Sequence, residues 1–155
     1  MPYKVACFVW LLSKEAVLTE DNLMKRGLNL TSRSVFCGGQ TETVAHLFLH
    51  CKITRQLWRL FLSLKGISWT MPGRVTETLQ SWEEVGMQAK DKRKWRIIPA
   101  TIWWTIRKER NFRVFKNIEN SIEQVELNCI LTLCFWCKQI WSNDPVSIID
   151  VLGSL

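Results

Sequence analysis

The sequence predicts an all-α protein, a compact bundle of six to seven helices. Apolar residues recur every three or four positions along most of the chain, which is the spacing of the buried face of a helix. Residues typical of helix starts and stops bound several of these stretches, and no segment shows the strict alternation of a half-buried strand. The length of 155 residues and the nine tryptophans suit one domain with a substantial core. We therefore expect residues 1–155 to form a single domain, and the abrupt first residues suggest a piece of a longer protein.

Two helices are expected before residue 30. Residues 5–13 are apolar nearly all round, which predicts a buried helix, with a strand as the alternative. Residues 20–26 form a short helix with both ends marked. Thr19 is a good N-cap, and Glu20 and Asp21 lie in the first turn, where the helix dipole favours acidic side chains.

The next segment, residues 34–51, carries three metal-competent side chains. Cys37, His46 and Cys51 follow the spacing C-x8-H-x4-C. Structural zinc sites use four nitrogen or sulfur ligands, and a cysteine at position 34 would complete C-x2-C-x8-H-x4-C. That position holds Ser34, whose neutral hydroxyl is a poor substitute for a thiolate. The sequence therefore predicts a zinc-knuckle-like loop between the second and third helices, with zinc bound weakly or lost. A three-ligand zinc with an open position also resembles a hydrolytic site, but Glu42 is the one acid placed to act as a general base, and a knuckle loop offers no substrate pocket.

The spacing of two of these ligands sets a geometric condition. Thr41 can cap a helix over residues 42–50, which contains His46 and ends near Cys51. Five residues along an α-helix rotate the side chain about 140° out of alignment. The helix must therefore end or unwind before Cys51 if both residues are to share a metal. His50 is the alternative fourth ligand, if the end of the helix rearranges.

The remaining chain reads as four more helices. Apolar periodicity predicts helices over residues 53–64, 75–85, 94–116 and 120–141. Pro99 lies inside the third of these, so a kink or a fresh start is expected there. Asn120 is the predicted cap of the last helix, which residues 143–145 (Asn-Asp-Pro) close.

Positive charge is concentrated in residues 90–116. Ten lysines and arginines stand against two acids there, which gives +8, whereas the rest of the chain sums to −1. Such a cluster is typical of a nucleic-acid-binding surface, although a solvated helix face is the alternative. The predicted contacts to RNA or DNA are Lys94, Arg107, Lys108, Arg110 and Arg113. Trp95 and Phe112 border the segment and are candidates for stacking on bases.

Other classes of function find little support. No apolar run approaches the length of a membrane span, and no constellation predicts a catalytic site or a small-molecule substrate. The pair Cys134 and Cys137 has redox spacing but lies inside an apolar helix, so we expect buried core thiols there and at Cys7 and Cys129. The six cysteines follow no convincing secretory signal, which favours a reducing, intracellular compartment, with the nucleus as one option.

The order of these features resembles a known family. The ordered set is Pro2-x-Lys4-Val5-x-x-Phe8-x-Trp10, Val17-Leu18-Thr19-x-Asp21-x-Leu23-x-x-Arg26-Gly27, the knuckle with Glu42-Thr43-x-x-His46-Leu47, Trp58, Gly66-Ile67-x-Trp69, Trp95-x-x-Ile98-Pro99, and Trp104-x-x-x-Lys108-Glu109-Arg110-Asn111. It resembles the zinc-binding domain at the C-terminal end of reverse transcriptases in plant non-LTR retrotransposons.

This resemblance implies a non-catalytic module that holds template RNA or target DNA beside the reverse transcriptase domain of a parent polyprotein. The ligands of the family map onto Ser34, Cys37, His46 and Cys51, and the serine departs from the pattern. The alternative is a structural or protein-interaction fragment, such as a degenerate retroelement relic, that no longer binds metal. Whether RNA or DNA is preferred is left open by the sequence.

Overall fold

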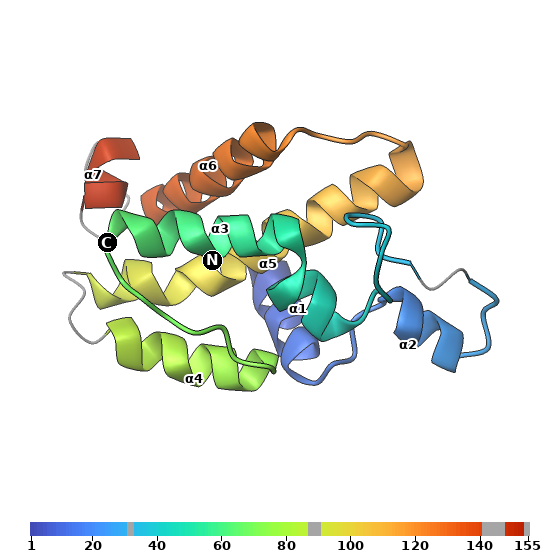
Figure 1. The fold of residues 1–155 in the computed structure, drawn as a ribbon. Helices are drawn as coiled ribbons and strands as arrows, with labels where there is room; N and C mark the ends of the chain where they lie inside the picture. The colour runs from blue at the N-terminus through green and yellow to red at the C-terminus, as the bar shows by residue number, and fades with distance from the viewer. Residues whose placement is uncertain (31–32, 87–90, 141–147, 154–155) are drawn as a thin grey trace.

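A computed structural model of the chain describes residues 1–30, 33–86, 91–140 and 148–153 (Figure 1). Over these ranges the chain forms seven α-helices and one π-helical turn, with no strand, so the predicted all-α class is confirmed. The elements are α1 (Tyr3–Ser13), α2 (Glu20–Lys25), the π-helical turn η1 (His46–His50), α3 (Lys52–Leu64), α4 (Val75–Val85), α5 (Lys92–Lys116), α6 (Ile122–Ile140) and α7 (Ile148–Gly153). The knuckle-like loop lies between α2 and α3, as predicted. None of the described helices is long and apolar enough to cross a membrane.

The long helix α5 organises the bundle. It runs the length of the molecule in Figure 1 and contacts α1, α3, α4, α6 and η1. The side chain of Asp91 caps its start by accepting from the backbone N–H groups of Arg93 and Lys94 at 3.0 and 3.4 Å. Pro99 lies inside the helix without ending it, so the fresh start that was one of two expectations is wrong. The helix stops at Asn117, which adopts the left-handed conformation with φ of 52°.

Tryptophan side chains fill the centre of the core. The rings of Trp82 and Trp95 stack with centroids 4.3 Å apart and planes 5° apart. Each indole N–H also donates to the backbone carbonyl of the other residue at 2.9 Å. Trp58 meets Trp82 and Trp103 edge to face, so the buried rings join α3, α4 and α5.

Three predicted helix caps differ from the structure. The Thr19 hydroxyl donates to the Asp21 carboxylate and makes no cap hydrogen bond at the start of α2. The turn after residue 43 is capped by the Thr43 hydroxyl, which accepts from the His46 N–H at 3.1 Å, and not by Thr41. Ser121, and not Asn120, accepts at the start of α6, because the Asn120 amide is held by a buried acid on α5. The predicted closing residues 143–145 lie outside the described residues.

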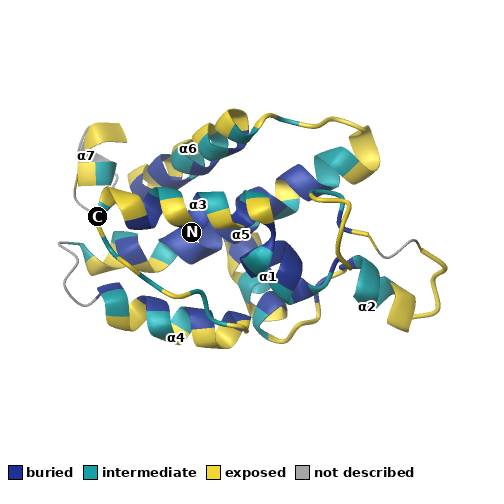
Figure 2. Ribbon diagram, viewed as in Figure 1, coloured by how far each residue is buried: buried dark blue, intermediate teal, exposed yellow. Residues whose placement is uncertain are grey.

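Helix α1 is not buried on all sides, contrary to the expectation for residues 5–13. Val5, Phe8 and Leu12 face the core, but Trp10 is 61% exposed and Leu11 is 39% exposed. Figure 2 shows buried, intermediate and exposed residues along this helix. The apolar run therefore has an inner face that packs and an outer face that remains on the surface.

Candidate metal centre

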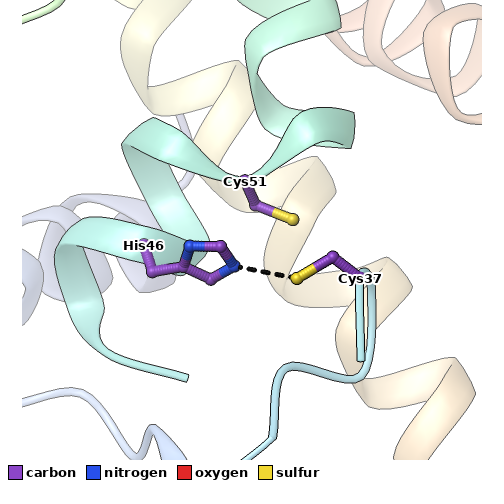
Figure 3. A group of neighbouring side chains, drawn as sticks. All are labelled: Cys37, His46 and Cys51. Carbon is purple, nitrogen blue, oxygen red and sulfur yellow. Dashed lines mark hydrogen bonds between the residues drawn. The ribbon is translucent and has the colours of Figure 1, made fainter. Parts of the chain in front are cut away.

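The structure brings the three predicted ligands together. The donor atoms of Cys37, His46 and Cys51 all lie within 4.8 Å of one another, and they form a potential metal site (Figure 3). The Cys37 sulfur is 3.3 Å from Nε2 of His46. Cys37 comes from the loop and is exposed, whereas Cys51 at the start of α3 is completely buried. The cluster is therefore open to solvent on the side of Cys37.

A π-helical turn solves the alignment problem between His46 and Cys51. Residues 46–50 wind more loosely than an α-helix, and the Cys51 N–H donates to the His46 carbonyl, five residues back, at 2.6 Å. Cys51 itself is extended, with φ of −59° and ψ of 143°. The predicted unwinding before Cys51 is thus confirmed, and it turns both side chains to the same side.

The core satisfies carbonyl groups that this unwinding leaves without helical partners. The Thr54 hydroxyl donates to the Leu47 carbonyl at 2.6 Å. The indole N–H groups of Trp103 and Trp58 both point at the Phe48 carbonyl, at 3.0 and 3.4 Å. Because buried carbonyls without donors are costly, these three side chains stabilise the π turn and so help to place the ligands.

Ser34 lies at the cluster, as its position in the motif predicts. It is buried, and its backbone closes the loop: its N–H donates to the Gln40 carbonyl at 2.7 Å and its carbonyl accepts from the Gly38 N–H at 2.8 Å. Gly38 adopts a φ of +65°, which glycine tolerates best. The Ser34 hydroxyl is within hydrogen-bonding reach of the sulfurs of both Cys37 and Cys51.

His50 does not join the cluster. Among the described residues, the grouped metal-competent side chains are Cys37, His46 and Cys51 alone. The His50 ring instead lies near the backbone of Gly73 and the charge of Arg55. The alternative in which His50 serves as the fourth ligand would therefore require a rearrangement that this fold does not show.

The pKa shifts of Cys37 and His46 favour the protonation states that bind a metal. Burial raises the pKa of the Cys37 thiol, but hydrogen bonds from the backbone of Gly39 and the Ser34 hydroxyl outweigh it, so the net pKa lies below the ordinary value. Burial, with the neighbouring charge of His50, lowers the pKa of His46 and favours the neutral imidazole. The pKa of Cys51 is raised, first by burial and then by the charge of Cys37. The fold therefore shifts Cys37 toward its thiolate and His46 toward its neutral imidazole, relative to the free side chains.

The donor set has the ligand types that zinc prefers, and it supplies three of the four ligands that a structural zinc site uses. Two thiols and an imidazole are ligands that structural zinc prefers, and the Ser34 hydroxyl stands where a third thiolate would complete the tetrahedron. Bound zinc would supply a cross-link between the loop of Cys37 and the start of α3. The residues present are thus sufficient for a site of three strong ligands.

The five basic residues predicted to contact nucleic acid fall into three groups. Lys108 is exposed and Arg107 is half-buried, and among the described residues no carboxylate forms an ion pair with either. Lys94 is mostly buried, with its ammonium 3.9 Å from Asp91. The remaining two, Arg110 and Arg113, are directed into the protein.

Arg110 and Arg113 form buried ion pairs. Arg110 donates to Glu42 at 2.9 Å, and Arg113 donates to Glu109 at 2.8 Å. Both carboxylates are buried, and Glu42 also accepts from the Glu20 N–H at 3.2 Å. Because these cations are paired inside the protein, they leave little charge for phosphates. Trp95, predicted as a possible base-stacking residue, is buried against Trp82 and contributes only to the core.

Glu42 is a site residue that the sequence analysis missed in this role. It anchors the loop to α5, four residues before the ligand His46. One of its oxygens, Oε2, has no hydrogen-bond partner among the described residues although it is buried. Nothing in its local sequence distinguishes it from a surface acid, since its partner is 68 residues away.

The other cysteines are structural. Cys129, Cys134 and Cys137 are buried on α6, as predicted, and burial raises the pKa of Cys129 to about 12 and that of Cys137 to about 11. Cys7 is only half-buried, in contrast to the expectation. The spacing of Cys134 and Cys137 therefore does not create a redox pair.

Comparison with known proteins points to the same site. A family model described as zinc-binding in reverse transcriptase matches residues 1–58, which include Ser34 and the three ligands. A protein of Arabidopsis thaliana named "Putative ribonuclease H protein" is 29% identical over 58 residues, which cover 37% of this chain and 9% of that protein. No solved structure matches the chain significantly. The resemblance to the zinc-binding domain of reverse transcriptases is thus confirmed for residues 1–58, which carry the cluster.

Proposed function

We propose that this chain, whose first 58 residues match a zinc-binding family of reverse transcriptases, is a non-catalytic zinc-knuckle module that holds nucleic acid. The observation that carries the proposal is the convergence of Cys37, His46 and Cys51 on one point. The module spans residues 1–155 as one domain, with the knuckle at residues 34–51 and the basic helical segment at residues 90–116. A parent polyprotein would supply the polymerase beside it.

Zinc would act here as a structural link. The cluster joins the loop at Cys37 to the helix that begins after Cys51, and both segments rest on α5 through Glu42 and the Trp103 hydrogen bond. An ion at the cluster would therefore stabilise the surface of α5 against which the knuckle packs. The four described cavities are lined by residues other than Cys37, His46 and Cys51, which supports a structural role for the ion.

Nucleic acid would contact the cations that take part in none of the described ion pairs. Lys108 and Lys116 on α5 are exposed, and Arg107 is half-buried on the same helix. Because phosphate contacts release counterions, binding of RNA or DNA should weaken steeply as salt rises. Arg110 and Arg113 contribute to this proposal only by shaping α5.

The experiment measures binding of a fluorescent RNA or DNA oligonucleotide by the purified chain at several salt concentrations. Lys108→Glu with Lys116→Glu should weaken binding and reduce the salt slope by roughly two. Arg59→Glu, an exposed cation on α3 outside the basic segment, is the matched control and should change little. Absence of binding at low salt, or a salt-independent affinity, would reject nucleic-acid binding.

A structural or protein-interaction role is the second candidate. The observation that favours it is the burial of Arg110 and Arg113 in ion pairs, together with serine at position 34. In that case the purified chain would bind neither zinc nor nucleic acid, yet would fold normally. Zinc content measured on the same preparation separates the two candidates.

A further inference from the structure

A groove lies between α1, the segment that leads into α2, and the second half of α5. It has a volume of about 810 Å³. Its floor is formed by apolar core side chains, among them Phe8 and Leu47. Two aromatic rings on its walls stand in solvent, since Tyr3 is 85% exposed and Phe115 is 74% exposed. These are rings that the fold itself does not bury.

The charged side chains among the described lining residues of the groove are all cationic. Lys4, Arg107 and Arg110 line it, and no aspartate or glutamate is among its described lining residues. Arg110 is neutralised by Glu42, but among the described residues no carboxylate pairs with Lys4 or Arg107. The Arg107 guanidinium lies over the rings of Phe8 and Trp104, at 4.8 and 5.0 Å from their centroids. The two rings therefore hold the Arg107 guanidinium at the groove, where it forms none of the described salt bridges.

We propose that this groove binds single-stranded nucleic acid, with unpaired bases stacked on Tyr3 and Phe115 and the phosphates paired with Lys4 and Arg107. The inference rests on the proposed nucleic-acid function and specifies its surface and its substrate class. Exposed aromatic rings beside cations are what a flexible strand requires, because each free base presents a face for stacking. In a duplex those faces are covered by neighbouring base pairs, so the rings would find no partner. A protein partner is the other occupant that an apolar groove admits. The cations Lys4 and Arg107, with no acid among the described lining residues, favour a polyanion instead.

The test is fluorescence anisotropy of the full chain with a labelled 12-nucleotide oligouridine, its deoxy counterpart, and a duplex of the same length. Single strands should bind at least tenfold more tightly than the duplex at the same salt. Tyr3→Ala and Phe115→Ala should each weaken single-strand binding about five- to hundredfold, the usual range for loss of one stacked ring. Trp10→Ala is the matched control, because Trp10 is an exposed ring on α1 that does not line the groove. Thermal melts of the variants should coincide with the parent, since all three rings are largely exposed.

The outcomes separate this inference from the proposed function. Tighter binding to the duplex, or unchanged single-strand binding in Tyr3→Ala and Phe115→Ala, overturns the groove while nucleic-acid binding through α5 stands. An equal loss in Trp10→Ala also overturns it, because the effect would then not be specific to the groove. No binding to any of the three probes at low salt overturns both.

Discussion

Two nitrogens of the Arg110 guanidinium donate to the same carboxylate oxygen of Glu42, Nε at 3.2 Å and Nη2 at 2.9 Å. The two residues are 68 positions apart, and both are buried. The pair joins the knuckle loop, inside the segment that matches the zinc-binding family, to α5, which lies outside that segment. A charge removed from one side leaves the other buried and unpaired.

Replacing Arg110 by methionine should therefore destabilise the fold strongly. Loss of one partner of a buried ion pair costs about 3–5 kcal/mol, because the remaining charge is desolvated without compensation. The free energy of unfolding, measured by urea denaturation, should fall by about that amount. Lys108→Met, on the neighbouring exposed position, should change it by less than about 0.5 kcal/mol.

The double variant Glu42→Gln with Arg110→Met checks the cause. Removing both charges should recover much of the lost stability, since no buried charge remains. A double variant as unstable as the sum of the two single variants would show that the residues act independently, and that the pair is not the reason for their effect.

Gly86→Ala should disturb the tryptophan stack. A Cβ built at Gly86 would lie 1.9 Å from the ring of Trp95. That ring is stacked on Trp82, and each indole N–H donates a hydrogen bond to the backbone carbonyl of the other residue. The ring must shift, and overpacking of a tight core costs about 1–3 kcal/mol. The near-ultraviolet circular dichroism of the indoles should change with it.

Gly73→Ala is the comparison for that variant. A Cβ there has its nearest neighbour 4.0 Å away, at the flexible end of Glu77. The melting temperature should stay within about 2 °C of the parent. Equal losses in the two variants would mean that the effect belongs to glycine in general, and not to the contact with Trp95.

Apolar periodicity in the sequence predicted the helices well, because it depends on residues close together in the chain. The three ligands were also predicted from spacing, since a short motif fixes which donors can meet. The condition that the helix unwind before Cys51 followed from helix geometry alone, and the π turn meets it.

The remaining features depend on contacts between distant segments. The reach of Trp103 to the Phe48 carbonyl spans 55 residues, and no local pattern marks it. Charge counting identified residues 90–116 but could not assign Arg110 to Glu42, since the two lie 68 residues apart in the sequence. The partner of Arg113, Glu109, is only four residues away, so the sequence alone could have suggested that pair. The exposed side of α1 was missed because an apolar run does not reveal which of its faces the core covers.

Thr54→Val tests whether the core holds the π turn. Valine matches the shape of threonine but cannot donate to the Leu47 carbonyl, which the Thr54 hydroxyl reaches at 2.6 Å. The buried carbonyl is then unsatisfied, which costs about 1–3 kcal/mol of stability. Because the turn positions Cys51, zinc affinity should weaken as well. A loss of stability without any change in zinc affinity would show that the π turn does not determine the position of the zinc ligands.

Thr132→Val is the matched control for that experiment. Thr132 donates to the Asn128 carbonyl at 2.7 Å, but inside α6 and only partly buried. The helix already satisfies that carbonyl, so both stability and zinc affinity should stay near those of the parent.

Acidification should destabilise the metal-free protein. Burial lowers the pKa of His46, and burial also lowers that of His50, so the unfolded chain, with a histidine pKa of about 6.5, binds more protons than the fold. This contribution is present above about pH 6.5 and is lost as pH falls through the lower pKa of the folded state. Unfolding measured in a chelator between pH 7.5 and 5.5 should show the decline. His46→Gln and His50→Gln should each flatten it, and an unchanged slope in both would rule out the histidines as its source.

Ser34→Cys should restore a fourth strong ligand. Ser34 is buried beside both sulfurs, so a cysteine there would add its thiolate to the donors already grouped within 4.8 Å. Structural zinc contributes about 10–16 kcal/mol through four ligands, so one more thiolate should tighten zinc binding on the order of a hundredfold. Competition with a chelating dye measures the affinity, and the melting temperature with zinc should rise in parallel. Ser34→Ala removes the hydroxyl without adding a ligand, and should bind zinc no more tightly than the parent. Equal zinc affinities in the parent, Ser34→Cys and Ser34→Ala would show that position 34 is not a corner of the site.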